Sequence, residues 1–118
     1  MVLQGQDIEL ITGENNIIIE MHLTTDRGLP LILTGSALTW KLVDQNSVVQ
    51  ITKSATVIAD GTAGGAVYSV VQVTLEKADT VSLNLNTTFT HELWEVKYDL
   101  TELMLSEGNV TFIPGHPP

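Results

Sequence analysis

The chain has 118 residues, 43% of them hydrophobic, and its 14 acidic residues against five Lys and Arg give a formal net charge of −9. This length predicts one domain, and the apolar fraction excludes a disordered chain. The acidic balance argues against nucleic-acid binding, which requires a basic face, and against adhesion to anionic lipid. Apolar content and charge together indicate an acidic surface with apolar area buried against another subunit.

The chain contains no cysteine, so disulfides and thiolate metal sites are excluded. The first ten residues lack the basic region and apolar core of a signal peptide, and no apolar run approaches the roughly 20 residues that span a bilayer. We therefore expect a soluble protein that is synthesised in the cytoplasm and has no contact with a membrane.

Strand patterns begin close to the N-terminus. Residues 7–11 predict a short first strand, bounded by turn residues. Residues 16–23 alternate, with Ile19 and Met21 on one face and His22 on the other. This period of two is typical of a half-buried strand.

The stretch DRGLPLILTGSALTW, residues 26–40, holds the most informative pattern of the chain. It contains a turn at Gly28, an edge-type strand carrying Pro30, a second turn at Gly35, and the start of an alternating strand over residues 37–43. This order of turns and strands is typical of an antiparallel β-structure.

The strand over residues 37–43 places Leu38, Trp40 and Leu42 on its inner face, so we expect Trp40 to lie in the core. The polar turn at residues 44–47 then predicts a hairpin with residues 48–52.

A glycine-rich loop follows at residues 60–65. We expect it to be mobile and to order on assembly, which makes Gly64 and Gly65 candidate contact residues. Residues 66–75 form the longest strand candidate, and residues 76–83 contain the one plausible helical turn.

The C-terminal third predicts three more strands. They are expected at residues 89–99, 103–105 and 110–113, the last two joined across a turn at residues 106–109. Residues 115–118 contain two prolines and form a tail.

The alternation within residues 89–99 changes phase. Phe89, His91 and Leu93 share one face of the strand, whereas Trp94, Val96 and Tyr98 share the other face. Either a β-bulge near Leu93 and Trp94 swaps the buried face, or the strand is buried on both sides.

Seven or eight short strands without a long helix predict an antiparallel, immunoglobulin-like β-sandwich. We expect residues 1–114 to form this single domain, followed by the tail at residues 115–118.

The residues that could carry chemistry do not form a catalytic, cofactor or metal motif. His22, His91 and His116 lack the spacing of metal ligands, and no serine lies in a nucleophile elbow. Glu92 and Glu95 are most simply interpreted as solvated charges on a strand. The sequence therefore favours a protein that is not an enzyme.

Trp94 and Tyr98 are the candidate contact residues of the C-terminal third. If both are exposed on one face, they form a platform on which a sugar ring can stack; Val96 between them favours burial in the core or at a subunit interface.

The order of these elements resembles a family of phage structural modules, the immunoglobulin-like domains of tail and baseplate proteins such as the N-terminal module of siphophage upper baseplate proteins. The elements that carry the resemblance are the turn at residues 26–30, the Leu33-Thr34-Gly35 turn, the strand with Trp40, the loop at 61–65, the Asp79-Thr80 pair, the strand from Phe89, and residues 107–112. One element departs from the family pattern, because residues 99–101 lack the glycine of a second Asp-x-Gly turn.

The resemblance implies a non-enzymatic subunit of the virion tail or baseplate. Such a protein acts through contacts with other virion proteins or with copies of itself, as a trimer or hexamer, and needs no cofactor. The alternative is a carbohydrate-binding or adhesin-type module of a bacterial surface protein, with Trp94 and Tyr98 as stacking residues. Exposure of Trp94 would favour the sugar-binding alternative, and its burial in a subunit interface would favour the virion subunit.

Overall fold

The computed structural model describes residues 8–11, 17–24, 28–29, 31–33, 36–60, 68–80, 83, 87–96 and 101–113. Their elements are β1 (Ile8–Ile11), β2 (Ile17–Leu23), β3 (Ala37–Asp44), β4 (Val49–Ala59), β5 (Ser69–Leu75), the one-turn helix α1 (Lys77–Thr80), β6 (Phe89–Val96) and β7 (Glu102–Ile113). The expected all-β class is confirmed. All strand pairs are antiparallel except β1 with β7, which is parallel.

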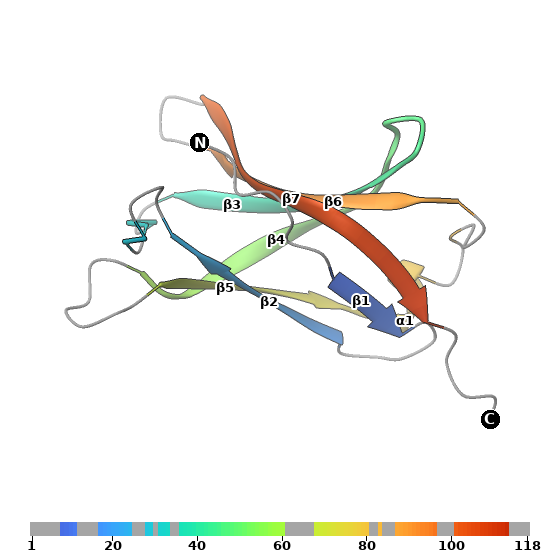
Figure 1. Ribbon diagram of the computed structural model, residues 1–118, viewed down its shortest axis with the longest axis horizontal. Helices are drawn as coiled ribbons and strands as arrows, with labels where there is room; N and C mark the ends of the chain where they lie inside the picture. The colour runs from blue at the N-terminus through green and yellow to red at the C-terminus, as the bar shows by residue number, and fades with distance from the viewer. Residues whose placement is uncertain are drawn as a thin grey trace.

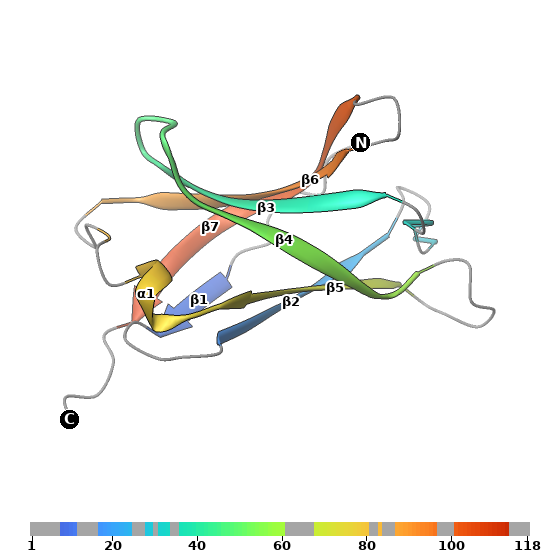
Figure 2. The ribbon, with the colours of Figure 1, turned by 180° about the vertical axis from the view of Figure 1, so that it is seen from behind.

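The strands follow one another in the order β1-β7-β6-β3-β4-β5-β2. β4 carries the chain from one layer to the other, because its first part pairs with β3 as far as Ala55 and its last part pairs with β5 from Thr56 onward. Figures 1 and 2 show the result: β3 and β6 lie in one layer, β2 and β5 lie in the other, and β4 crosses between them. β7 begins beside β6 and runs toward the other layer, where its end pairs with β1. The sheet therefore curls so that its two parts face each other.

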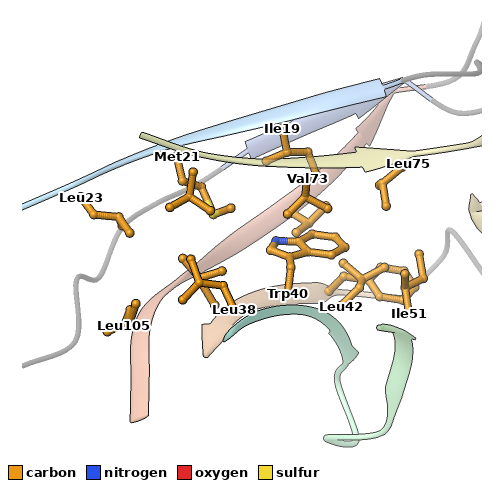
Figure 3. Close-up of a cluster of buried hydrophobic side chains, with 14 of the residues drawn as sticks. Ile19, Met21, Leu23, Leu38, Trp40, Leu42, Ile51, Val73, Leu75 and Leu105 are labelled. Carbon is orange, nitrogen blue, oxygen red and sulfur yellow. The ribbon is translucent and has the colours of Figure 1, made fainter. Parts of the chain in front are cut away.

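The core lies between these two layers, as Figure 3 shows. Each strand contributes the apolar side chains of its inner face, as the alternation in the sequence predicts. The buried apolar residues of β2, β3, β4 and β5 are Ile19, Met21, Leu23, Leu38, Trp40, Leu42, Val43, Ile51, Val71, Val73 and Leu75. Trp40 is completely buried, and removing its indole from water contributes at most about 5 kcal/mol.

The β3–β4 hairpin forms where the polar turn predicted it. Both side-chain oxygens of Asp44 accept hydrogen bonds, Oδ1 from the N–H groups of Asn46 and Val48 at 2.9 Å and Oδ2 from the Gln50 amide at 3.0 Å. Ser47 adopts a φ of 64°, in the left-handed region that tight turns require. The hairpin is longer than expected, since β4 continues from Thr52 to Ala59.

Three sequence predictions are wrong in detail. Residues 31–33 do not form a strand, although Leu33 is buried as an inward side chain should be. The longest strand is β7, and not the segment before Leu75. Residues 106–109 are not a turn, because β7 runs without interruption from Glu102 to Ile113.

The turn-forming residues remain in β7 because they pair with β6. Gly108 lies opposite His91, and Asn109 lies opposite Thr90, in the antiparallel ladder. The pairing of a whole strand outweighs the local turn preference of a Gly-Asn sequence. The expected loop at residues 60–65 lies, apart from Asp60, outside the described residues, as does the tail.

The predicted β-bulge is present where β6 passes from Leu93 to Trp94, but its extra residue is on the partner strand. Leu93 lies opposite Ser106 and Trp94 opposite Met104, so Leu105 has no residue opposite it. Leu105 and Ser106 are both buried, which means that β7 changes its inner face at this point. β6 alternates without interruption, so neither the predicted swap of its buried face nor burial on both sides is correct.

Candidate functional site

Trp94 lies on the outer face of the β3–β6–β7 layer. In β6 the side chains of Phe89, His91, Leu93 and Glu95 point into the core, and those between them are half-buried on the outside. This alternation buries the Glu95 carboxylate, which the sequence analysis interpreted as solvated. Its Oε2 accepts a hydrogen bond from the Ser36 hydroxyl at 2.5 Å, so the buried oxygen has a partner.

The indole of Trp94 is held in place by two charged side chains of the same outer face. Its Nε1 donates a hydrogen bond of 3.0 Å to Oε1 of Glu92. The ammonium of Lys41 lies 5.4 Å from the centre of the indole ring, within the range of a cation–π interaction. Trp94 is thus a half-buried residue of the outer face and not a core residue. Its ring is not an open stacking surface, since the Lys41 ammonium lies over it.

A hollow of about 330 Å³ lies next to this group, between the β3–β4 turn and the start of β6. Its lining is mostly polar and consists of Lys41, Val43, Asp44, Gln45, Ser47, Val49, Thr88, Thr90 and Glu92. Lys41 and Glu92 lie directly opposite each other in the β3–β6 ladder. They therefore belong both to the hollow and to the surroundings of Trp94.

The other predicted contact residues, Tyr98, Gly64 and Gly65, lie outside the described residues. Within the described ranges, no three His, Asp or Glu side chains come together in a way that could hold a metal ion. In the same part of the chain, no helix has the length and apolar character needed to cross a membrane.

A second candidate surface is built around residues 31–33, which are held by polar contacts to residues of and beside β4 and β5. The Leu33 N–H donates to the carboxylate of Asp60 at 3.0 Å, and the Ser69 hydroxyl donates to the carbonyl of Leu31 at 2.6 Å. Asp60 follows the end of β4, and Ser69 begins β5. The segment is therefore fixed to both strands by hydrogen bonds and not by strand pairing.

Four exposed large apolar side chains lie within two sequence positions of the residues that make these contacts, and we call them the apolar end: Leu29, Ile32, Ile58 and Tyr68. Ile32 is 68% exposed, although Leu33 beside it is buried. Ile58 and Tyr68 lie within two positions of Asp60 and Ser69, which hold the segment. Figure 1 shows the end of β4 and the start of β5 beside this segment.

No pattern in the sequence identifies the apolar end. The sequence predicts an edge-type strand carrying Pro30, and nothing in it places Ile58 and Tyr68 near that strand. The alternation of Leu31, Ile32 and Leu33 was the available signal, because it puts Ile32 on the opposite side from the two leucines.

An aromatic pair extends this surface along the outer face of β2 and β5. The rings of His22 and Tyr68 are stacked, with centroids 4.1 Å apart and an angle of 14° between their planes. Nε2 of His22 also lies 3.5 Å from a carboxylate oxygen of Glu20. Tyr68 is thus immobilised by a neighbouring ring, which lowers the entropy cost of using it in a contact.

Comparison with known proteins adds no relative. No protein-family description matches the chain, and no curated protein matches it.

Proposed function

We propose that this chain is a non-enzymatic structural protein that acts through protein–protein contacts, as a subunit of a phage or prophage tail or baseplate. In this proposal the curled sheet is an immunoglobulin-like β-sandwich, and the subunit assembles with copies of itself as a trimer or hexamer or docks on other virion proteins. The observation that supports it best is the apolar end, because a cluster of exposed large apolar side chains is characteristic of an interaction surface.

Two further features support an assembly role. The apolar end is held by hydrogen bonds to buried groups, so it is presented in a fixed geometry that favours association. The excess of negative charge keeps the free subunit soluble despite its exposed apolar side chains.

The test is the mass of the purified protein, measured by size-exclusion chromatography with light scattering over a range of concentrations. We expect a discrete trimer or hexamer, and we expect Ile32→Asp to dissociate it, because the change buries a charge in the interface. Thr52→Asp is the matched control, since Thr52 is also exposed but lies on β4 away from the apolar end. A monomer at every concentration would remove self-assembly from the proposal.

The carbohydrate-binding alternative is favoured by a different observation, the polar hollow beside Trp94. Trp94 does not line the hollow but contacts two residues that do, Lys41 and Glu92, and hydroxyl, amide and charged groups converge in it as they do in small-molecule sites. A glycan array tests it: binding that is lost in Trp94→Ala and kept in Tyr68→Ala would support a sugar site at the hollow. No bound glycan, or equal binding by both variants, would contradict it.

A further inference from the structure

Strand β2 has one edge that the described part of the chain does not cover. β2 pairs with β5 over all seven of its residues, and no other described strand pairs with it. The strand IIIEMHL contains no proline, glycine or lysine, the residues that commonly protect an exposed edge from pairing with another chain. Among the described residues, the outer edge of β2 has no ladder partner apart from the bridge at Thr24, which follows the strand, so this edge can accept a further strand.

The outer side chains of β2 carry complementary groups two positions apart. Glu20 and His22 are about half exposed, at 50% and 46% of their side-chain surfaces, and their polar atoms are 3.5 Å apart. Ile18 on the same face is 60% exposed. The inner side chains Ile19, Met21 and Leu23 are buried in the core.

The two-fold antiparallel registers of β2 with a second copy differ in what they place opposite Glu20 and His22. An axis between two residues places inner side chains opposite outer ones and is excluded. An axis at a residue outside 20–22 places His22 opposite a residue outside β2. Of the others, a two-fold axis at Glu20 places two carboxylates opposite each other, and an axis at His22 places two imidazoles opposite each other. An axis at Met21 places Glu20 opposite the partner's His22 on both sides of the axis. In that register Ile19 lies opposite the partner's Leu23 on the inner face.

We propose that β2 pairs with β2 of a second copy around a two-fold axis at Met21, which joins the two curled sheets into one continuous sheet. The pair is held by backbone hydrogen bonds and by a group of two Glu20 carboxylates and two His22 imidazoles, in which each imidazole can donate a hydrogen bond to the carboxylate opposite it. It does not depend on the proposed function, because any function of the chain is compatible with a two-fold pair.

Sedimentation velocity of the full chain tests the interface. In the Ile32→Asp variant, which lacks the larger assembly, we expect a concentration-dependent dimer, and we expect His22→Glu to weaken it by about tenfold or more, because four carboxylates then meet across the axis. Thr74→Glu adds the same charge to the same sheet face on β5, away from the edge, and is expected to leave the dimer intact. Glu20→His combined with His22→Glu restores a carboxylate opposite an imidazole on both sides of the axis and should restore the dimer.

Engineered cysteines test the register itself, since the chain has none of its own. We expect a disulfide between the two variants when Glu20→Cys and His22→Cys are mixed and oxidised, because these positions are directly opposite. Either variant alone should cross-link far less. A monomer at all concentrations, a dimer unaffected by His22→Glu, or equal cross-linking by each variant alone would overturn the proposal.

The two assembly surfaces can be told apart by their variants. Ile32→Asp acts on the apolar end and leaves the β2 edge intact, whereas His22→Glu changes the edge and also removes the ring that stacks on Tyr68. Ile32→Asp is therefore the variant that separates the two surfaces. A protein that loses its trimer or hexamer with Ile32→Asp but keeps the two-fold pair supports both surfaces. A pair that persists in a protein without any larger assembly supports the β2 edge and contradicts self-assembly through the apolar end.

Discussion

Trp40 and His91 form a buried hydrogen-bonded pair in the middle of the core. The indole Nε1 donates to Nδ1 of the imidazole at 3.2 Å, and neither residue is exposed to solvent. They lie diagonally across β3 and β6, because Trp40 is opposite Leu93 and His91 is opposite Leu42. His91 is thus the hydrogen-bond acceptor that allows the N–H group of Trp40 to be buried.

Replacing the acceptor should destabilise the fold more than its volume suggests. We expect His91→Leu to lower the free energy of unfolding by about 2 kcal/mol or more, because the indole N–H is then buried without its partner. Urea denaturation followed by circular dichroism measures the change.

The double variant His91→Leu with Trp40→Phe separates the hydrogen bond from the loss of packing. Since the donor is also removed, we expect the double variant to be more stable than the sum of the single changes predicts, by about 1 kcal/mol. Simple additivity of the two single variants would show that the bond contributes nothing.

Truncation of Leu33 should destabilise the fold strongly, whereas truncation of its neighbour Ile32 should have almost no effect on stability. Leu33→Ala removes a buried side chain and should lower the free energy of unfolding by about 2–5 kcal/mol. Ile32→Ala removes an exposed one and should change the free energy by no more than about 0.5 kcal/mol. Urea denaturation of both variants at one low protein concentration, where assembly does not contribute, gives the comparison; equal losses would place Ile32 in the core.

Asp79 should make the stability of the protein depend on acid pH. Burial raises the pKa of this carboxyl, but the hydrogen bond from the Glu76 N–H at 2.7 Å and the Lys53 ammonium at 3.0 Å favour the charged form and bring the pKa below its usual value. Because the native pKa is the lower one, the stabilisation is fully present above the unfolded pKa of about 3.9 and is lost as the pH falls through the native pKa.

The variants Asp79→Asn and Lys53→Met make this dependence measurable. At pH 7 we expect Asp79→Asn to be less stable than the wild type by about 0.5–1 kcal/mol, and we expect the difference to disappear as the solution is acidified below the native pKa. Lys53→Met keeps the carboxylate and its backbone bond, so it should lose less. A difference that does not change between pH 7 and pH 2 would rule out the titration of Asp79 as its cause.

Ser47 and Gly28 both adopt positive φ angles, 64° and 78°, and their substitution should have opposite effects. Ser47→Gly relieves the strain of a side chain in the left-handed region and should stabilise the protein by about 0.5 kcal/mol. Gly28→Ala introduces that strain and should cost about 1 kcal/mol, although no atom lies within 4 Å of the added Cβ. Thermal unfolding of the two variants checks the signs, and a shift of both melting temperatures in the same direction would contradict the assignment.

The local sequence pattern was sufficient to predict the buried side chains of strands that bury one face. The alternation in residues 17–23 and 37–43 placed Ile19, Met21, Leu38, Trp40 and Leu42 inside, because the side-chain period of a strand is fixed by its backbone geometry. The turn at Asp44 was equally predictable, since its side chain bonds to the backbone of its own turn. These parts of the fold depend on neighbours in the sequence.

The sequence pattern did not predict the features that depend on pairing with a neighbouring strand. The phase change after Leu93 was visible in the sequence, yet it is β7 that absorbs it, through the unopposed Leu105. The same pairing keeps Gly108 and Asn109 within a strand although both favour a turn. It also keeps Glu95 on the inner face, where Ser36, 59 positions away in the sequence, supplies its hydrogen bond.

The sequence by itself therefore determined an all-β chain of about seven strands, its core tryptophan and its first hairpin, because these follow from composition, side-chain alternation and local hydrogen bonds. Only the tertiary structure decided which strands pair, where the bulge lies, and which apolar side chains remain outside. The segment with Ile32 comes near the residues before Asp60 and Ser69, which include Ile58 and Tyr68, only through the hydrogen bonds of Leu33 with Asp60 and of Leu31 with Ser69. Surfaces of this kind depend on contacts between residues that are distant in the chain, which no local pattern records.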